Sequence, residues 1–165
     1  MKHRSFLSLG RPSLPLALAA VFVLATAGCM GPKIGPAVPD AGWDTSYEDA
    51  LSPHTQLALG VMQALKNEPE TIPPGRRADI AQRWQKLADL IKGSAGPGDI
   101  SRARLDVEAA LDKGLLDRIK EERLRRGDLM GFMMSSGVRI PKGGMKNLNP
   151  DHVAATKAVE ALNKN

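Results

Sequence analysis

The sequence predicts a small all-α domain, a bundle of four to five short helices that follows a signal peptide and a Pro/Gly-rich tether. Three observations support this prediction. Apolar residues recur every three or four positions through most of the chain after residue 52, and prolines and glycines separate these runs at intervals that suit short helices. No stretch alternates apolar and polar residues as a half-buried strand would.

The first helix is predicted to begin at residue 53. Ser52 is suited to be its N-cap, and Pro53 suits the first helical position because that position needs no N–H partner. Asn67 and Pro69 are expected to end it. One apolar stripe follows the predicted start, made of Leu57, Val61, Met62 and Leu65.

The second helix has the clearest amphipathic pattern in the chain. It is expected to open near Pro73 and Pro74 and to stop at Gly93. Its apolar residues are spaced by four, three and four positions, which places them on one face. They are Ile80, Trp84, Leu87 and Ile91. We therefore expect Trp84 to be buried.

Further helical runs follow the loop "GSAGPG". Asp99 is expected to cap the third helix, and Gly114 to end it. A further helical run is expected to end at Gly127, and Asp128 to cap a short helix over "LMGFMMSS". Domain boundaries follow from these signals. The helical domain should cover residues 52–136. A glycine-rich loop should follow over residues 137–149, and a C-terminal helix, opened by Asn149 and Pro150, should cover residues 150–165. The apolar positions of these runs are Ile100, Ala103, Val107, Leu111, Leu115, Leu116, Ile119, Leu124, Ala155, Ala158, Val159 and Leu162.

Residues 1–28 have the pattern of a secretory signal. Three basic residues precede an uncharged apolar stretch of about fourteen residues, which is shorter than the roughly twenty needed to span a bilayer. Small residues then lead to Cys29, the only cysteine of the chain. "LATAGC" resembles the lipobox of bacterial lipoproteins, which implies lipidation of Cys29 and removal of residues 1–28. An uncleaved anchor helix, or an ordinary signal cut after Ala27, are the alternatives.

Residues 29–51 are predicted to form the lipidated cysteine and a flexible tether, because prolines are frequent there and no apolar period is sustained. Trp43 and Tyr47 stand out within this segment. We expect them to fold back onto the domain or to lie at the membrane interface, rather than to form a ligand platform.

The charge balance excludes nucleic-acid binding as the leading hypothesis. The net charge of +5 includes Lys2, Arg4 and Arg11 of the predicted signal, and without them the chain has 20 basic and 18 acidic residues. Only Trp43, Tyr47, Trp84 and Phe132 remain as aromatic residues after Cys29, so little surface is left for stacking on bases.

The sequence predicts no enzyme activity, no metal site and no cofactor. His54 and His152 are the two histidines after the signal, and both lie at predicted helix starts next to Pro53 and Asp151. We interpret them as exposed helix-start residues, since no spacing typical of zinc ligands surrounds them. The carboxylates on the predicted helices are spaced like solvated faces, and nothing pairs them as an acid and a base.

Two segments are candidates for binding. The first, "RIKEERLRR", is either a solvated face with internal ion pairs or a surface for anionic lipid or an acidic partner. The second, "GDLMGFMMSSG", carries apolar side chains around more than one face of a short helix, so we expect the Met133 or Met134 side to be exposed. The predicted docking residues are Met130, Phe132, Met133, Met134, Arg123 and Arg126.

A copper site is the alternative for the same methionines. Thioethers are soft ligands that bind Cu(I), and Met130, Met133 and Met134 lie close together in sequence, with Met145 nearby and His152 as a further ligand. Methionine as an adaptable core residue is the simpler interpretation.

Three segments resemble a group of small, uncharacterised bacterial envelope proteins: "LSPHTQLALGVMQAL", "RRADIAQRWQKLADLI" and "LLDRIKEERLRRGDLMGFM". The resemblance covers residues 52–134 and implies a helical envelope domain without an assigned active site. Together with the lipobox, it leads us to expect a non-catalytic lipoprotein in the cell envelope. It would be anchored to the cytoplasmic or the outer membrane through Cys29, and its domain would bind an envelope protein in an accessory or chaperone-like role.

Overall fold

The computed structural model describes residues 42–138 and 148–164. Its elements are α1 (Pro53–Asn67), the single 3-10 turn η1 (Pro69–Thr71), α2 (Pro74–Lys92), α3 (Pro97–Glu108), α4 (Lys113–Glu121), α5 (Arg126–Ser135) and α6 (Pro150–Lys164). The only extended pairing among these residues is an isolated bridge between Ala50 and Arg125. The predicted all-α fold is confirmed. The described residues form six helices rather than four to five, and the break between α4 and α5 lies at Arg123, which has a φ of 48°, rather than at Gly127 and Asp128, which belong to the first turn of α5.

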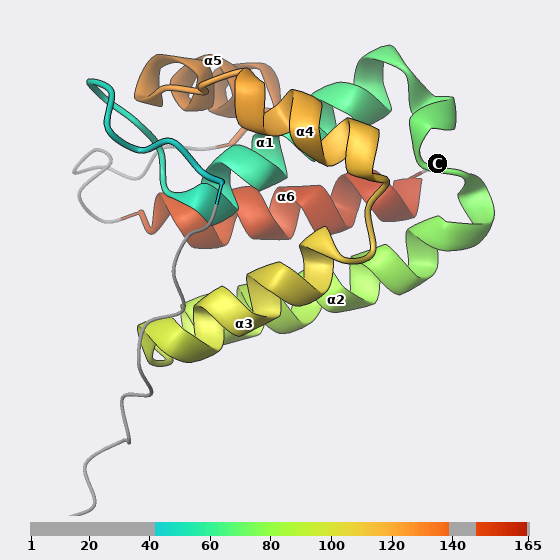
Figure 1. Ribbon diagram of the computed structural model, residues 1–165, viewed down its shortest axis with the longest axis horizontal. Helices are drawn as coiled ribbons and strands as arrows, with labels where there is room; N and C mark the ends of the chain where they lie inside the picture. The colour runs from blue at the N-terminus through green and yellow to red at the C-terminus, as the bar shows by residue number, and fades with distance from the viewer. Residues whose placement is uncertain (1–41, 139–147, 165) are drawn as a thin grey trace, which may run out of the picture. The chain divides into compact units, whose positions relative to one another are not determined.

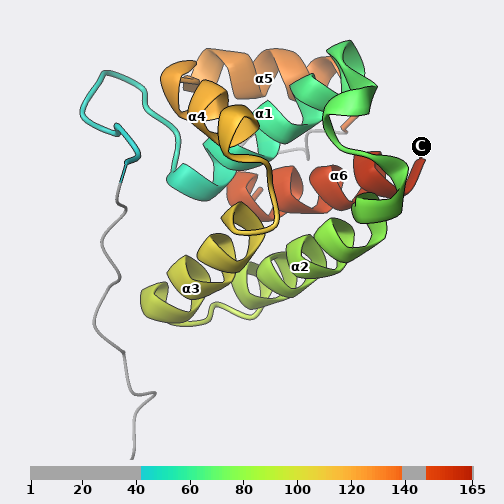
Figure 2. The same ribbon diagram turned by 45° about the vertical axis from the view of Figure 1, so that its right-hand side comes forward.

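α6 is the central helix of the described domain. Figures 1 and 2 show it between an upper group of α1, α4 and α5 and a lower pair of α2 and α3. It packs against both α1 and α2, while α3 packs on α2 and α4 on α1. The buried face of α6 consists of Ala154, Ala155, Ala158 and Leu162. Small alanine side chains allow neighbouring helices to approach closely, so this face suits a central position.

The helix starts agree with the sequence in two cases and differ in a third. The Ser52 hydroxyl caps α1 by accepting from the backbone N–H of Thr55, and the Asn149 side chain accepts from the first two N–H groups after Pro150. The sequence predicts that Asp99 caps α3 and that Gly114 ends it, but Gly96 is the N-cap, α3 ends at Glu108, and Gly114 lies in the first turn of α4. Pro97 begins α3 two residues before Asp99, which lies in its first turn, where a negative charge is favourable.

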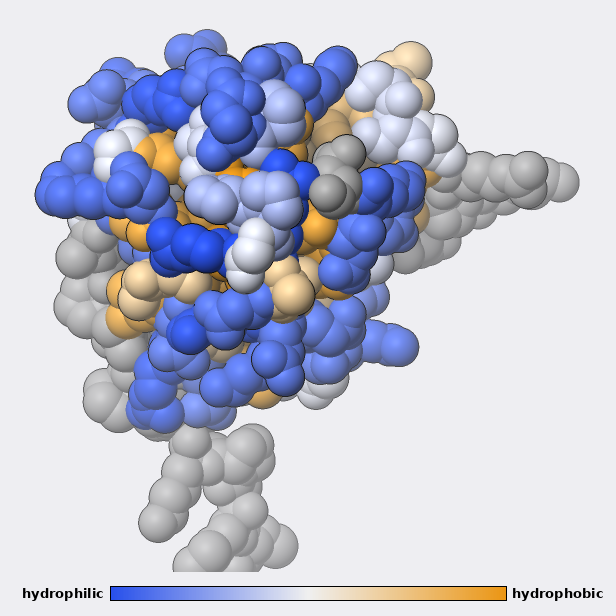
Figure 3. Space-filling view, turned by 90° about the vertical axis from the view of Figure 1, so that its right-hand side faces the viewer, coloured by the Kyte–Doolittle hydropathy of each residue, from blue (hydrophilic) through white to orange (hydrophobic). Residues whose placement is uncertain are grey.

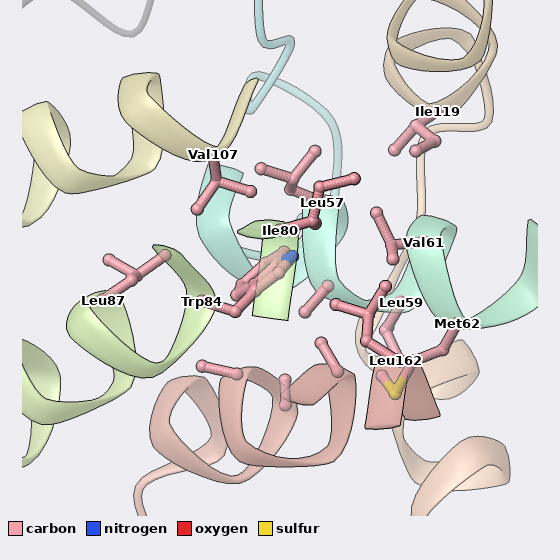
Figure 4. Close-up of a cluster of buried hydrophobic side chains, with 14 of the residues drawn as sticks. Leu57, Leu59, Val61, Met62, Ile80, Trp84, Leu87, Val107, Ile119 and Leu162 are labelled. Atoms are coloured by element: carbon pink, nitrogen blue, oxygen red, sulfur yellow. The ribbon is translucent and has the colours of Figure 1, made fainter. Parts of the chain in front are cut away.

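Trp84 is at the centre of the core, as the periodicity predicts. Its side chain is fully buried, and Figure 4 shows it extending from α2 into the space between α1 and α6. The other three residues of the predicted stripe, Ile80, Leu87 and Ile91, are buried with it. The indole Nε1 has no hydrogen-bond partner in the described structure. Burial of the large ring therefore outweighs the cost of leaving one donor unpaired.

α1 and α4 approach each other closely at Gly60. A Cβ atom at this position would lie 2.4 Å from Cγ2 and 2.6 Å from Cγ1 of Ile119, which is itself fully buried on α4. Normal carbon–carbon contacts are about 3.5–4.0 Å, so no side chain fits between the two helices here. Figure 4 shows Ile119 reaching from α4 toward α1.

Residues 42–51, which we call the N-terminal strap, pack against the helical domain. Trp43 is 7% exposed and Leu51 9% exposed, and the backbone N–H of Arg126 donates to the carbonyl of Asp49 at 3.0 Å. The predicted domain boundary at residue 52 therefore differs from the structure, in which the packed domain begins within the predicted tether. Folding back is the alternative that the structure supports for Trp43 and Tyr47.

Several predictions concern residues outside the described part of the chain. They are the signal peptide over residues 1–28, lipidation of Cys29, the tether up to residue 41, Met145, and the loop except its ends. Among the helices that the structure describes, none combines the length and the apolar character needed to cross a bilayer.

Candidate functional site

Two aromatic side chains, Trp43 and Tyr47, hold the N-terminal strap against the domain, and cationic side chains lie close to each ring. We call these two sets of contacts clamps. The indole of Trp43 donates to Glu108 at 3.0 Å, and the charged groups of Arg104 and Lys120 lie 6.0 and 5.3 Å from its ring centroid. Arg104 and Lys120 also form ion pairs with Glu108, so the buried charges compensate one another. The strap is therefore fixed to α3 and α4 by a tryptophan that contacts one anion and two cations.

Tyr47 forms the second clamp. Its hydroxyl donates to the carbonyl of Leu124 at 2.7 Å, and the guanidinium groups of Arg123 and Arg125 lie 5.9 and 5.8 Å from its ring centroid. Burial raises the pKa of the Tyr47 phenol above its ordinary value. Arg123 also pairs with Asp44 of the strap at 2.9 Å.

The basic run "RIKEERLRR" thus serves mainly internal contacts. Arg118 pairs with Glu68 at 3.0 Å, Lys120 with Glu108 at 3.4 Å, and Arg123 with the strap. Of the two interpretations that the sequence leaves open, internal ion pairs describe these three cations better than a surface for anionic lipid. Arg126 lies elsewhere, in a cavity of about 360 Å³ beside Leu129, Pro150 and Asp151.

The structure does not gather the six predicted docking residues into one surface. Met133 is fully buried in the core, whereas Met134 is 74% exposed, because successive residues of a helix point about 100° apart. The expectation of an exposed methionine therefore holds for Met134, and including Met133 in a docking surface is wrong. Met130 and Phe132 are half-buried, and Arg123 faces the strap.

The same geometry separates the methionines of the alternative copper site. A Cu(I) ion needs sulfur atoms that converge on one point, but Met133 points into the core and Met134 into solvent. Met145 lies outside the described residues. The described part of the chain also contains no group of three or more His, Cys, Asp or Glu side chains that could hold a metal ion.

Phe132 belongs to an open trough between α1, α5 and α6, which is our candidate site. A cavity of about 430 Å³ is bounded by Met62 and Leu65 of α1, Phe132 of α5 and Ala161 of α6. A second cavity of about 310 Å³ shares Met62 and Phe132 with the first and continues along α5 to Gly127. We call the two cavities together the α5 trough. Its size is that of a ligand or peptide site.

The α5 trough has an apolar floor and a charged rim. Lys66 of α1 and Lys157, Glu160 and Lys164 of α6 stand around the larger cavity. Lys157 pairs with Glu160 at 2.6 Å, while Lys66 and Lys164 are exposed and form no ion pair within the described structure. Figure 3 views the face at which α6 ends, where hydrophilic side chains surround recesses that show apolar atoms.

Most residues that line the trough were not predicted from the sequence, although their spacing along each helix is a signal that could have indicated them. Lys157, Glu160, Ala161 and Lys164 follow the i, i+3, i+4, i+7 spacing that defines one helix face, next to the buried alanine face. Met62, Leu65 and Lys66 have the matching spacing on α1. Sequence periodicity gives each face separately, but which faces line a common trough depends on how the helices pack.

A polar junction joins the starts of α1 and α6. One oxygen of Asp151 accepts from the hydroxyls of Ser52, at 2.7 Å, and Thr55, and the other lies 3.1 Å from Nε2 of His54. Burial alone would raise the pKa of Asp151, but the hydrogen bond and charge of His54 and the two hydroxyls outweigh it and hold this pKa well below its usual value.

This junction has the composition of a Ser-His-Asp site without its geometry. In such a site the histidine accepts the serine proton and the aspartate orients the histidine. Here both Ser52 and His54 contact Asp151, so the carboxylate is the centre and the Ser52 hydroxyl donates to Asp151 rather than to the imidazole of His54. The cluster therefore locks two helix starts together. His54 is less exposed than expected from its position, with 18% of its side chain accessible.

The comparisons with known proteins add no family to this description. No family model matches the chain, and neither the curated proteins nor the solved structures contain a significant match.

Proposed function

We propose that the protein is a lipid-anchored component of a bacterial cell envelope and that its helical domain binds another envelope protein without catalysing a reaction. The observation that carries the binding role is the α5 trough, whose larger cavity of about 430 Å³ is lined by Phe132 and bordered by two lysines that form no ion pair with the described residues. Recesses of this kind are where proteins bind ligands and partner helices.

The anchor is supported by the sequence. The basic start, the short apolar stretch and the small residues before Cys29 are what a lipoprotein signal needs, because the processing enzymes act on an extended segment of small side chains ending in a cysteine. One acyl chain binds a membrane only marginally, so stable anchoring requires the two or three chains that lipoprotein processing adds.

Labelling with a fatty-acid probe tests the anchor. The wild-type chain should incorporate the probe, and Cys29→Ser should abolish incorporation and leave the precursor uncleaved by the lipoprotein peptidase. Met30→Ser is the matched control, since it changes the neighbouring residue and keeps the thiol. Normal labelling of Cys29→Ser would refute lipidation at this residue.

Crosslinking in intact cells tests the binding role. The full-length chain should give one or a few discrete adducts with envelope proteins. Phe132→Lys should remove these adducts, whereas Met134→Lys, on the same helix but outside the trough, should retain them. Thermal unfolding of both variants checks that the domain is intact. If the wild-type chain forms no adduct with any protein, the proposed binding role is wrong.

A further inference from the structure

We infer that the α5 trough receives an acidic amphipathic helix of the partner protein. This inference rests on the proposed function and specifies the chemistry of its partner. Three properties of the trough carry it: its length along α5, its apolar floor, and the position of the unpaired lysines.

The length of the trough favours a helix over a compact small molecule. The two cavities share Met62, Lys66 and Phe132, so they form one continuous recess from Gly127 to Ser136. The nine steps from Gly127 to Ser136 span about 14 Å at a rise of about 1.5 Å per residue. A partner helix needs about 11 Å to place three anchors at positions i, i+4 and i+7, which fits within this length.

The floor of the trough selects apolar anchors. Phe132 is half-buried and faces the recess from α5, opposite Met62 and Leu65 of α1 and Ala161 of α6. Thioether and phenyl side chains adapt to different apolar partners at little cost, and a half-buried phenylalanine gains further burial when a partner covers it.

The lysines at the border of the trough favour an acidic partner, and the positions of the charged residues set the direction in which the partner helix lies. A lysine in the last turn of a helix is ordinary, since it offsets the negative end of the helix dipole. Lys66 and Lys164, however, end two different helices and border the same cavity, so their charges add there. At the other end of the trough lies Asp128, whose carboxylate accepts from the backbone N–H of Arg125 at 2.7 Å.

The larger cavity, near Ser136, therefore has Lys66 and Lys164 on its border, whereas the smaller cavity, near Gly127, has Lys66 and Asp128. Acidic residues are favoured in the first turn of a helix and basic residues in the last turn. A partner helix consequently lies with its acidic N-terminal turn between Lys66 and Lys164, and runs antiparallel to α5. Its dipole is then also antiparallel to that of α5, which is the favourable arrangement.

Site-specific photo-crosslinking of the full-length chain tests this inference in cells that produce the protein. A photoreactive amino acid replaces Ser135, which is exposed and borders the trough, and in a control chain it replaces Gln85, which is exposed on α2. Mass spectrometry then identifies the captured peptide. We expect capture at residue 135 of a segment with acidic residues at its start and apolar residues at i, i+3 or i+4, and i+7, and no such capture at residue 85.

Charge variants provide the second readout. In the chain carrying the photoreactive residue at 135, Lys66→Glu with Lys164→Glu should reduce capture about tenfold, because two favourable charge contacts become repulsive. Lys66→Arg with Lys164→Arg should retain it. Both lysines are exposed, so folding should be unchanged, which circular dichroism can check.

Each other result refutes the inference and reports separately on the proposed function. Capture of a basic or non-helical segment at residue 135, or of a protein only at residue 85, overturns the acidic helix and leaves a protein-binding domain. Capture of lipid alone, or of no molecule at either site, overturns both. Capture that persists in the double glutamate variant shows that the lysines do not select the partner, and the inference is then wrong.

Discussion

Replacing Gly60 by alanine should separate α1 from α4. The new methyl group would lie 2.4 and 2.6 Å from two carbons of Ile119, more than about 1 Å inside normal contact distance. Ile119 is 1% exposed, so its side chain is enclosed by the domain. Overpacking of a core typically costs about 1–3 kcal/mol, and this contact belongs at the upper end. Alanine regains about 1 kcal/mol of helix propensity, so the net loss should be about 2 kcal/mol.

Gly131→Ala is the matched control for this prediction. Gly131 also lies in a helix interior, on α5, but an added Cβ there meets no atom within 4 Å. The same chemical change should therefore stabilise the protein by up to about 1 kcal/mol, the opposite sign to Gly60→Ala. Urea unfolding followed by far-ultraviolet circular dichroism gives both free energies of unfolding.

A double-mutant cycle identifies Ile119 as the cause. Ile119→Ala alone should cost about 2–5 kcal/mol, because it removes the two carbons that a residue-60 methyl group would strike and leaves a cavity. Combined with Gly60→Ala, the new methyl group partly fills that cavity. The double variant should then be at least as stable as Ile119→Ala. If the free-energy changes of the two single variants simply add in the double variant, or if Gly60→Ala is as stable as the wild type, the close approach of α1 and α4 at Gly60 is refuted.

Three further predictions concern the junction, the strap and α5. Asp151→Asn should lower the free energy of unfolding by about 1.5–3 kcal/mol near pH 7. Because folding lowers the pKa of Asp151, its contribution is complete above the unfolded pKa of about 3.9 and is lost as pH falls below it, so wild type and variant should converge in acid denaturation curves. Trp43→Ala should cost about 3–5 kcal/mol in thermal or urea unfolding, a result that a free tether would not give. Met133→Lys should unfold the domain, while Met134→Lys should leave its melting temperature nearly unchanged; equal stability of the two would contradict their opposite burial.

The helices were predictable because each depends on local chemistry. The Ser52 cap with Pro53, the stripe that includes Trp84, and the Asn149 cap with Pro150 each act within one or two turns, and the structure contains all three. A local pattern, however, does not give the direction of each apolar side chain on a short segment. Five apolar residues within six positions made Met133 and Met134 equivalent in sequence, and only the packing of α5 on its neighbours distinguishes them.

The contacts that sequence reasoning missed join residues far apart in the chain. Trp43 reaches Glu108 across 65 positions, and Ser52 reaches Asp151 across 99. Proline and glycine around the strap indicated an extended backbone, which the strap has in part, but its two aromatic rings need partners that only the tertiary fold brings together. The trough arises in the same way, from three helix faces that are each unremarkable alone.

The strap also limits where the trough can meet its partner. A tether that ended at residue 51 would give a chain of 22 residues from Cys29, which can extend about 75 Å at 3.3–3.6 Å per residue. Because the clamp begins at Trp43, only 14 residue-to-residue steps separate it from the proposed lipid anchor at Cys29, and their reach is about 50 Å. Under the proposed function, the partner helix would have to lie within that distance of the bilayer plus the size of the domain. Releasing the whole strap, with both the Trp43 and the Tyr47 contacts, would lengthen this reach by about half, so under the proposed function the strap would couple the stability of the domain to the range over which it can search for its partner.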